Sequence, residues 1–208
     1  MITMTKRLLG SAALSLLMLG GCKDTPQPKT PLGVNAKHIE TETAALNAWF
    51  DERYKEDLAR SPMTKTYLGL PGDQDKLDDA SQAAIDEEYA LYQARIADMH
   101  EKFNFDRLDK QGQISYRLYE YDGNIAKALH PYADDDYVFN LMEGAHSDFP
   151  TFMVNFHKVK TPKDARNYIA RLNAAKTYLG QNRERAQAQF EKGVFLPKFT
   201  YDRMINAA

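Results

Sequence analysis

The stretch Glu143–Leu172 reads EGAHSDFPTFMVNFHKVKTPKDARNYIARL and combines sharp backbone punctuation with a dense apolar block. It opens with the irregular turn Gly144–Asp148, continues through the apolar residues of Phe149–Phe156, and reaches the helix-start signal Thr161–Asp164. In that signal the threonine suits the N-cap, the proline the first helical position, and the aspartate the capping-box position. The stretch therefore predicts a short helix capped by Asp148, followed by a long amphipathic helix.

Helical periodicity extends on both sides of this stretch. Apolar residues recur every three or four positions over 36–59, 82–102, 109–129 and 162–192, which is typical of amphipathic helices. One further helix is expected over 201–206, where the sequence stops shortly after the helix begins. We therefore expect an all-α fold, a bundle-like array of long amphipathic helices. We also expect residues 36–208 to be an incomplete N-terminal part of a larger helical domain.

The helix over 109–129 has two apolar faces. Its expected core face consists of Ile114, Leu118, Tyr121, Ile125 and Leu129. Tyr116 and Tyr119 form a second, aromatic surface. A helix with two apolar faces either lies wedged between neighbours or lacks a partner. In the long helix after Pro162, the charged residues, Arg171 among them, are expected on the solvent face.

The first 21 residues have the pattern of a bacterial lipoprotein signal peptide. Lys6 and Arg7 give a positive start, and the apolar run Leu8–Leu19 is shorter than the roughly 20 residues that cross a bilayer. The run leads into Leu-Gly-Gly-Cys, and small residues directly before the lone cysteine, Cys22, fit a lipid attachment site. An ordinary secretory signal that happens to hold a cysteine is the alternative interpretation.

The segment 22–35 is expected to be a flexible tether between the lipid and the helical region 36–208. It holds three prolines and few apolar side chains. Lys23, in place of an aspartate after the cysteine, favours the periplasmic face of the outer membrane within the bacterial cell envelope. The predicted partner at this end of the chain is therefore a membrane.

The bulk composition excludes some classes of partner. Apolar residues make up 43% and charged residues 27% of the chain, which argues against wholesale disorder. The formal net charge of −2 and the absence of a basic stripe give no support to nucleic-acid binding. A single cysteine rules out an intramolecular disulfide.

No metal site and no catalytic residue can be assigned from spacing. The five histidines do not have HExxH spacing, and the aspartates at 73–79 do not fit a calcium loop. We expect any functional site of this chain in the stretch that holds the turn Gly144–Asp148, because it combines histidines, aromatic residues and sharp backbone punctuation. The competing interpretation is that the turn is structural and that Phe149–Phe156 is core packing.

Several short pieces, in order, resemble the bacterial DUF885 family, whose members are often lipoproteins. The pieces are Ser61-Pro62, Leu68-Gly69, Leu77–Ser81, Gly144–Met153, His157, Asp164-Ala165, Tyr168–Leu172, Gly193 and Pro197–Phe199. Gly144–Met153 is the most specific of them, and the resemblance covers most of the chain after the tether.

The resemblance implies a predominantly helical protein similar to zinc-dependent peptidases of the HExxH type. In helical peptidases of this kind, N-terminal helices commonly form one wall of a deep substrate channel. The resemblance therefore makes Gly144, His146, Ser147 and Asp148 candidates for the lining of such a channel. Family members are longer, and their zinc-binding helix, with a motif similar to His-Glu-x-x-Pro-Gly-His-His, lies downstream of the region matched here. Zinc and a peptide-like substrate are therefore expected for the complete protein and not for this chain alone, for which we expect no hydrolase activity. The alternative is a non-enzymatic helical lipoprotein that acts as a binding or scaffold module.

Overall fold

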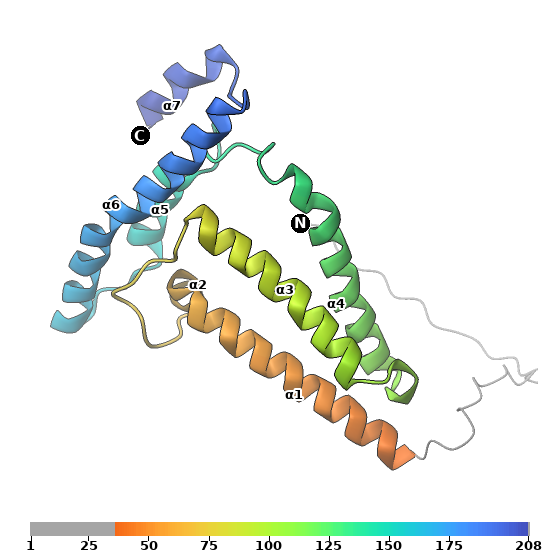
Figure 1. The fold of residues 1–208 in the computed structure, drawn as a ribbon. Coiled ribbons are helices and arrows are strands. Elements are labelled where there is room, and N and C mark those ends of the chain that lie inside the picture. The colour runs from red at the N-terminus through yellow and green to blue at the C-terminus, as the bar shows by residue number, and fades with distance from the viewer. Residues whose placement is uncertain (1–35, 208) are drawn as a thin grey trace, which may run out of the picture. The chain divides into compact units, whose positions relative to one another are not determined.

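The computed structural model describes residues 36–207, and within them the chain is all-α (Figure 1). The predicted signal peptide 1–21, the lipid attachment residue Cys22 and the tether 22–35 lie outside the described residues. The α-helices are α1 (Ala36–Arg60), α2 (Pro62–Tyr67), α3 (Gln82–Lys102), α4 (Lys110–Leu129), α5 (Ala145–Asn155), α6 (Pro162–Glu191) and α7 (Tyr201–Ala207). Three short 3-10 segments are η1 (Phe105–Arg107), η2 (His130–Tyr132) and η3 (Lys198–Thr200).

The predicted capping signals set several helix boundaries. Oγ1 of Thr161 accepts a hydrogen bond from the backbone N–H of Asp164, and the Asp164 carboxylate accepts one from the N–H of Thr161, so the capping box of α6 is complete. At the start of α3, Oγ of Ser81 accepts a hydrogen bond from the backbone N–H of Ala84. At the other end of α6, Gly193 follows the C-cap Lys192 with a φ of +86°, a left-handed conformation that suits glycine and ends the helix.

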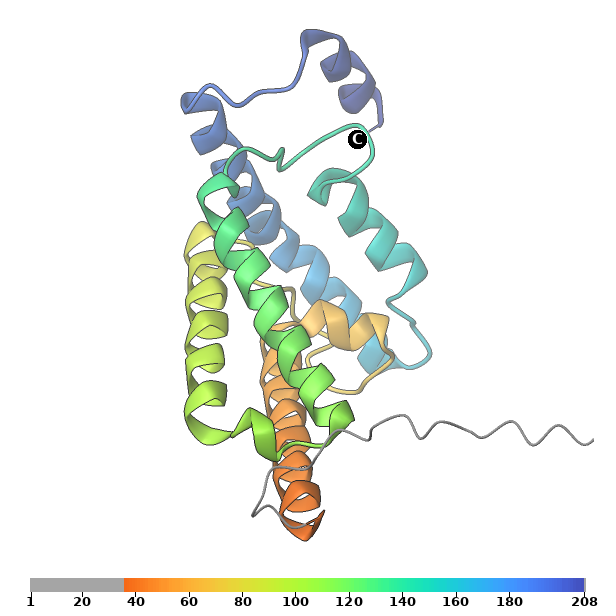
Figure 2. The same cartoon turned by 90° about the vertical axis from the view of Figure 1, so that its right-hand side faces the viewer.

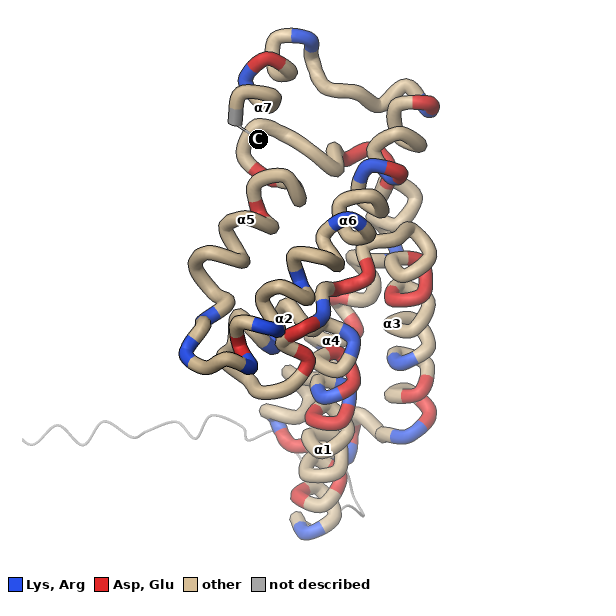
Figure 3. The backbone as a smooth tube through the Cα atoms, turned by 90° about the vertical axis from the view of Figure 1, so that its left-hand side faces the viewer, with Lys and Arg blue, Asp and Glu red and all other residues tan. Residues whose placement is uncertain are grey.

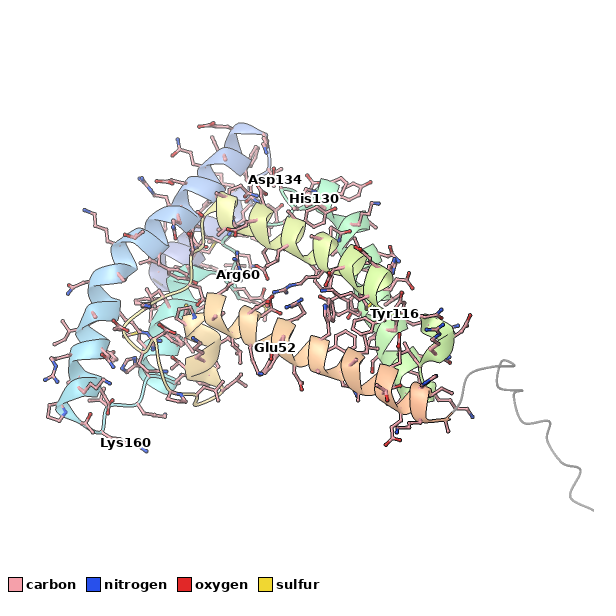
Figure 4. The ribbon with its side chains drawn as sticks, turned by 60° about the horizontal axis from the view of Figure 1, so that its bottom comes forward. Glu52, Arg60, Tyr116, His130, Asp134 and Lys160 are labelled. Carbon is pink, nitrogen blue, oxygen red and sulfur yellow. The ribbon has the colours of Figure 1, made fainter. Side chains whose placement is uncertain are left out.

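The first core cluster lies between α1, α3 and α4. Leu46 and Trp49 of α1 meet Met99 of α3, Leu108 of the loop after η1, and Tyr116 of α4 (Figure 4). Three aromatic side chains, Phe50, Phe103 and Tyr119, pack around the Trp49 ring in edge-on contacts at 5.4–6.2 Å. This cluster fixes the first three long helices to one another.

Polar contacts add to the same packing. The buried Arg95 of α3 donates to Asp57 at 2.6 Å and to Glu56 at 2.9 Å, both on α1. Nε1 of Trp49 donates to the Asp98 carboxylate at 2.8 Å. Because hydrogen bonds to charged groups are among the stronger ones, these contacts fix how α3 sits along α1.

The predicted core face of α4 is wrong. Ile114, Leu118, Tyr121, Ile125 and Leu129, named here the apolar stripe of α4, keep 39–60% of their surface exposed. The packed face lies on the opposite side of the helix and carries Gly112, Tyr116, Tyr119 and Gly123. Figure 2 shows α4 lying over α1 and α3 with its outer side uncovered.

Glycine explains why α4 turns this face inward. A Cβ on Gly123 would lie 1.9 Å from Cδ1 of Ile96, and one on Gly112 would lie 3.1 Å from the side chain of Thr43. A side chain at either position would displace Ile96 or Thr43, so glycine here lets α3 and α1 pack close to α4. Close backbone approach therefore decides the packed face, and the bulkier aliphatic face is left outside.

The second core cluster lies between α2, α5 and α6. Met63 of α2 packs with Phe149, Phe152 and Met153 of α5 and with Ala175 of α6. Along α5 the sequence has one charged residue, Asp148, so most of this helix is neutral in Figure 3. The apolar block of Phe149–Phe156 is thus partly core, as the structural interpretation of the sequence predicts. Among the described residues, no helix is long and apolar enough to cross a membrane.

Candidate functional site

The turn Gly144–Asp148 is held by its own side chains. Gly144 has a φ of +129° and precedes the first residue of α5. Its N–H donates to the Asp148 carboxylate at 3.0 Å, and its C=O accepts from Oγ of Ser147 at 3.1 Å. A Cβ at this glycine would come within 3.1 Å of Cα of Phe139, so no other residue fits without strain.

Asp148 is not the N-cap of the short helix, as the sequence predicted. The helix begins three residues earlier, at Ala145, and Asp148 lies in its first turn. Its carboxylate still satisfies a backbone N–H at the helix start, which is where a negative charge is stabilised by the helix dipole. Ser147 and Asp148 therefore stabilise the turn, and among the four candidate residues His146 is the one that faces a cavity.

His146 lies at the edge of an apolar cavity. Its ring contacts Phe139 edge-on, with centroids 5.6 Å apart. Its Nδ1 atom is buried and has no hydrogen-bond partner among the described residues. Because this atom has essentially no accessible surface and lies beside Gly144, other atoms of the residue line the cavity.

The cavity, named here the C-terminal cavity, has a volume of about 360 Å³. Its wall is formed by the segment 137–139, the last turns of α6, the linker 194–196 and α7. Six side chains of the wall carry rings: Tyr137, Phe139, His146, Phe190, Phe195 and Tyr201. Small-molecule sites are commonly concave, mostly apolar and about 300–1,000 Å³ in volume, and this cavity falls within that range.

Gln189 ties the two sides of this wall together. Its side-chain N–H₂ donates to the backbone carbonyl of Asp136 at 2.7 Å, and its side-chain oxygen accepts from the N–H of Val138 at 3.4 Å. The residue is almost completely buried. Sequence analysis missed this wall, because its residues come from four separate segments and carry no motif. The sequence feature that could have predicted this wall is the concentration of aromatic residues in two separate segments, 137–139 and 190–201.

His157 lies in a different place and has a structural role. Its Nδ1 is 2.8 Å from Nη1 of Arg171, which can only donate, so Nδ1 is the acceptor and Nε2–H donates to the Asp164 carbonyl at 3.3 Å. Arg171 is completely buried, which corrects its predicted place on the solvent face. It also donates from Nε to the Lys76 carbonyl at 2.8 Å and from Nη2 to Oγ1 of Thr66 at 2.7 Å. We name these residues the Arg171 cluster.

Burial has electrostatic consequences in the Arg171 cluster. It lowers the pKa of His157 below its ordinary value, and the nearby positive charge of Arg171 lowers it further. Burial also lowers the pKa of the Arg171 guanidinium, which remains charged because the ordinary value is so high. The cluster joins α2, the following loop, the segment after α5 and α6.

The acidic residues of the 61–81 loop serve the fold. Asp78 accepts from Oγ of Ser61 and from the N–H of Met63, at the start of α2. Asp73 pairs with Lys65 and Lys76, whose hydrogen bonds lower its pKa to about 2. Within residues 36–207 no group of three or more His, Cys, Asp or Glu side chains is placed to hold a metal ion.

Three comparisons with known proteins bear on identity. A family model described as "Bacterial protein of unknown function (DUF885)" matches residues 62–208. No curated protein and no solved structure gives a significant match to the chain.

Proposed function

Because the chain belongs to the DUF885 family of bacterial proteins, we propose that it is the N-terminal helical part of an envelope lipoprotein whose complete form resembles zinc metallopeptidases. The zinc motif belongs, in this proposal, to sequence beyond residue 208. The resemblance of Gly144–Met153 and the neighbouring pieces to this family supports the proposal.

The role proposed for this chain is to form one wall of a substrate channel. The observation that carries it is the C-terminal cavity, whose wall includes His146 and contains no Asp, Glu, Lys or Arg side chain. An apolar wall rich in rings can hold an apolar side chain of a peptide. It supplies no nucleophile and no metal-activated water, which zinc-dependent hydrolysis requires.

The lipid anchor is proposed at Cys22, with the chain on the periplasmic face of the outer membrane. The support is the positive start, the short apolar run and the Leu-Gly-Gly-Cys sequence. Mass spectrometry of the protein from a bacterial host is expected to detect acyl chains at Cys22, and Cys22→Ser is expected to abolish them. An unmodified cysteine after signal removal would exclude the lipoprotein part of the proposal.

Activity and metal content test the catalytic part. The 208-residue chain is expected to hydrolyse no peptide in a mixed peptide library and to purify without stoichiometric zinc. The gene sequence beyond the codon for Ala208 is expected to encode an HExxH segment, in frame or after a frameshift. One tightly bound zinc ion in the purified chain would overturn this division of roles.

The apolar stripe of α4 favours a second candidate function, that of a non-enzymatic binding or scaffold module. Five large side chains on the outer side of one helix form a surface that commonly marks an interaction site. A stop codon after residue 208 with no HExxH segment nearby, together with stable capture of a helical partner on this stripe, would favour the module over the peptidase part.

A further inference from the structure

The Arg171 cluster can form only while the ring of His157 is neutral. Nη1 of Arg171 lies 2.8 Å from Nδ1 of His157 and can only donate, so Nδ1 must keep its lone pair. A proton on Nδ1 would place two N–H groups and two positive charges on the same short line. Because His157 is 5% exposed and Arg171 is fully buried, water and salt screen this repulsion poorly. A charged His157 is therefore incompatible with the geometry of the cluster.

The groups that face the ring from α6 do not compensate a second positive charge. The Tyr168 ring lies edge-on to His157 at 5.1 Å and is neutral. The Asp164 carboxylate attracts a charged His157, but it already accepts two backbone N–H groups at the start of α6. Burial and the charge of Arg171 outweigh this attraction, and together they lower the pKa of His157.

The loop after α2 places its charges against Arg171. The carboxylates of Asp75 and Asp78 attract the Arg171 guanidinium, although neither forms an ion pair with it among the described residues. Asp73 is paired with Lys65 of α2, at 2.5 Å, and with Lys76, at 2.8 Å. These two hydrogen bonds lower the pKa of Asp73 to about 2, so both pairs persist in mild acid.

The segment between α5 and α6 fixes His157 on two sides. Its backbone N–H donates to the Phe152 carbonyl at 3.2 Å, and its Nε2–H donates to the Asp164 carbonyl at 3.3 Å. The charged side chains of this segment, Lys158 and Lys160, are both cations, and the one charged residue of α5 lies in its first turn. Since the ring is held in place, repulsion is expected to move the longer and more flexible Arg171 side chain.

Two side chains of α6 form hydrogen bonds to the described residues 61–81. Arg171 donates to the Lys76 carbonyl at 2.8 Å and to Oγ1 of Thr66 at 2.7 Å. Gln181 accepts the N–H of Ala80 at 3.0 Å and donates to the Asp79 carboxylate at 2.8 Å. Hydrogen bonds from Ser81 hold the pKa of Asp79 below its ordinary value, so the Gln181 attachment is insensitive to mild acid. The Arg171 attachment, in contrast, depends on a neutral histidine.

We propose that His157 is an acid-sensitive joint, whose protonation releases Arg171 from the loop 68–78 and opens this loop while residues 79–81 stay attached through Gln181. The release also uncovers a core residue, because the Arg171 guanidinium lies 4.9 Å over the otherwise buried ring of Phe152. Mild acid thereby changes the surface between α2, α5 and α6 without unfolding the first core cluster.

The size of the effect follows from proton linkage. In the open form His157 has its ordinary pKa of about 6.5, whereas in the closed form the pKa is lower. The neutral, closed joint is therefore fully stable above about pH 6.5, and it loses stability as the pH falls from there through the closed-form pKa. Between pH 7 and pH 5 the ratio of open to closed forms is expected to rise by up to about 25-fold.

Amide hydrogen exchange followed by NMR on the 208-residue chain tests the joint at single residues. The N–H groups of Leu70 and Lys76 form hydrogen bonds within the loop, at 2.8 and 3.0 Å, and the N–H of Ala80 bonds to Gln181. Once rates are corrected for the pH dependence of chemical exchange, protection at Leu70 and Lys76 is expected to fall by up to about 25-fold from pH 7 to pH 5. Protection at Ala80 and in α3 is expected to change by less than about twofold.

Variants at the joint separate His157 from other titrating groups. His157→Gln keeps an accepting oxygen but takes up no proton in this range, so protection at Lys76 is expected to stay constant from pH 7 to pH 5. His157→Leu removes the acceptor, and the loop is expected to be open at both pH values. His100→Gln is the matched control, because His100 pairs with Glu120 at 3.1 Å on α3 and α4, and it is expected to leave the response unchanged.

Three results would overturn the proposal. The first is a pH response at Lys76 that persists in His157→Gln. The second is an equal loss of protection at Lys76, at Ala80 and in α3, which would mean general unfolding in place of local opening. The third is a titration of the His157 ring nitrogens, followed by their ¹⁵N resonances, with a midpoint at or above the ordinary value of about 6.5.

Discussion

Replacing the buried Arg171 with alanine is expected to lower the free energy of unfolding by about 3–5 kcal/mol, because the change leaves several buried groups without partners. The guanidinium donates three short hydrogen bonds, to the Lys76 carbonyl at 2.8 Å, to Oγ1 of Thr66 at 2.7 Å and to Nδ1 of His157 at 2.8 Å. It also lies over the Phe152 ring, 4.9 Å from the centroid. Within residues 36–207 no carboxylate forms an ion pair with it, so these neutral acceptors replace the water that burial removes.

The magnitude follows from two separate losses. The hydrogen bonds of the charged arginine contribute about 1.5–3 kcal/mol each. Their full sum is not lost, because removing the arginine also removes the free-energy cost of burying its charge. Three acceptors left unpaired and a cavity the size of a long side chain then give the total of about 3–5 kcal/mol. Arg171→Met fills most of the space and isolates the polar loss, for which we expect about 2–3 kcal/mol.

Urea unfolding followed by circular dichroism measures both variants. Arg166→Met is the matched control, since Arg166 is exposed on the same helix, and it is expected to change stability by less than about 0.5 kcal/mol. The reasoning would be refuted if Arg171→Met were as stable as the wild type. That result would mean that the desolvation of the arginine cancels its hydrogen bonds, and that the cluster does not hold α2, the loop and α6 together.

Three further predictions concern pH, helix contact and exposed surface. Burial lowers the folded-state pKa of His157. The stability that neutral His157 contributes is therefore intact above its unfolded pKa of about 6.5 and is lost as the pH falls from there through the folded-state pKa. Between pH 7 and pH 5, His157→Gln is expected to lose less free energy of unfolding than the wild type, and an equal loss would contradict the assignment. Gly123→Ala is expected to lower the free energy of unfolding by about 1–3 kcal/mol because its Cβ meets Ile96, and by less when it is combined with Ile96→Val. Gly180→Ala, in open space within α6, is expected to raise it by about 0.5–1 kcal/mol. If calorimetry gave changes of the same sign for the two glycines, the close-contact argument would be wrong. Leu118→Glu on the apolar stripe of α4 is expected to reduce the fluorescence of a bound hydrophobic dye, while the free energy of unfolding changes by less than about 0.5 kcal/mol. Unchanged fluorescence would show that the dye does not bind to this stripe.

Helix positions were predictable because the signals that set them are local. The cap of α6 at Thr161 and the cap of α3 at Ser81 depend on hydrogen bonds to residues three positions away. Apolar periodicity likewise located α1, α3 and α4 to within about a residue. The start of α5 was missed because the residue before it, Gly144, has no side chain that could cap the helix. Asp148 accepts the N–H of Gly144 from inside the first turn instead.

The candidate site was predicted only in part. The sequence singled out His146 because it lies in an unusual turn, but the opposite wall of the C-terminal cavity comes from residues some fifty positions later. No local pattern connects Phe139 with Phe190 or Tyr201. Their meeting depends on how α6 and the segment before α5 pack, which Gln189 fixes through contacts to residues 136 and 138.

The sequence by itself determined the helical class of this protein, the helix boundaries that have side-chain caps, and its membership of a bacterial family, because these depend on residues close together in the chain. Tertiary structure alone decided which face of α4 is buried, since that depends on whether α1 and α3 can approach Gly112 and Gly123. It also decided that Arg171 is interior, although an arginine on a charged helix is ordinarily exposed. The acceptors that make its burial possible, on Thr66 and Lys76, lie about a hundred residues earlier in the chain, and only the packing of α2 and its loop against α6 brings them into contact with it.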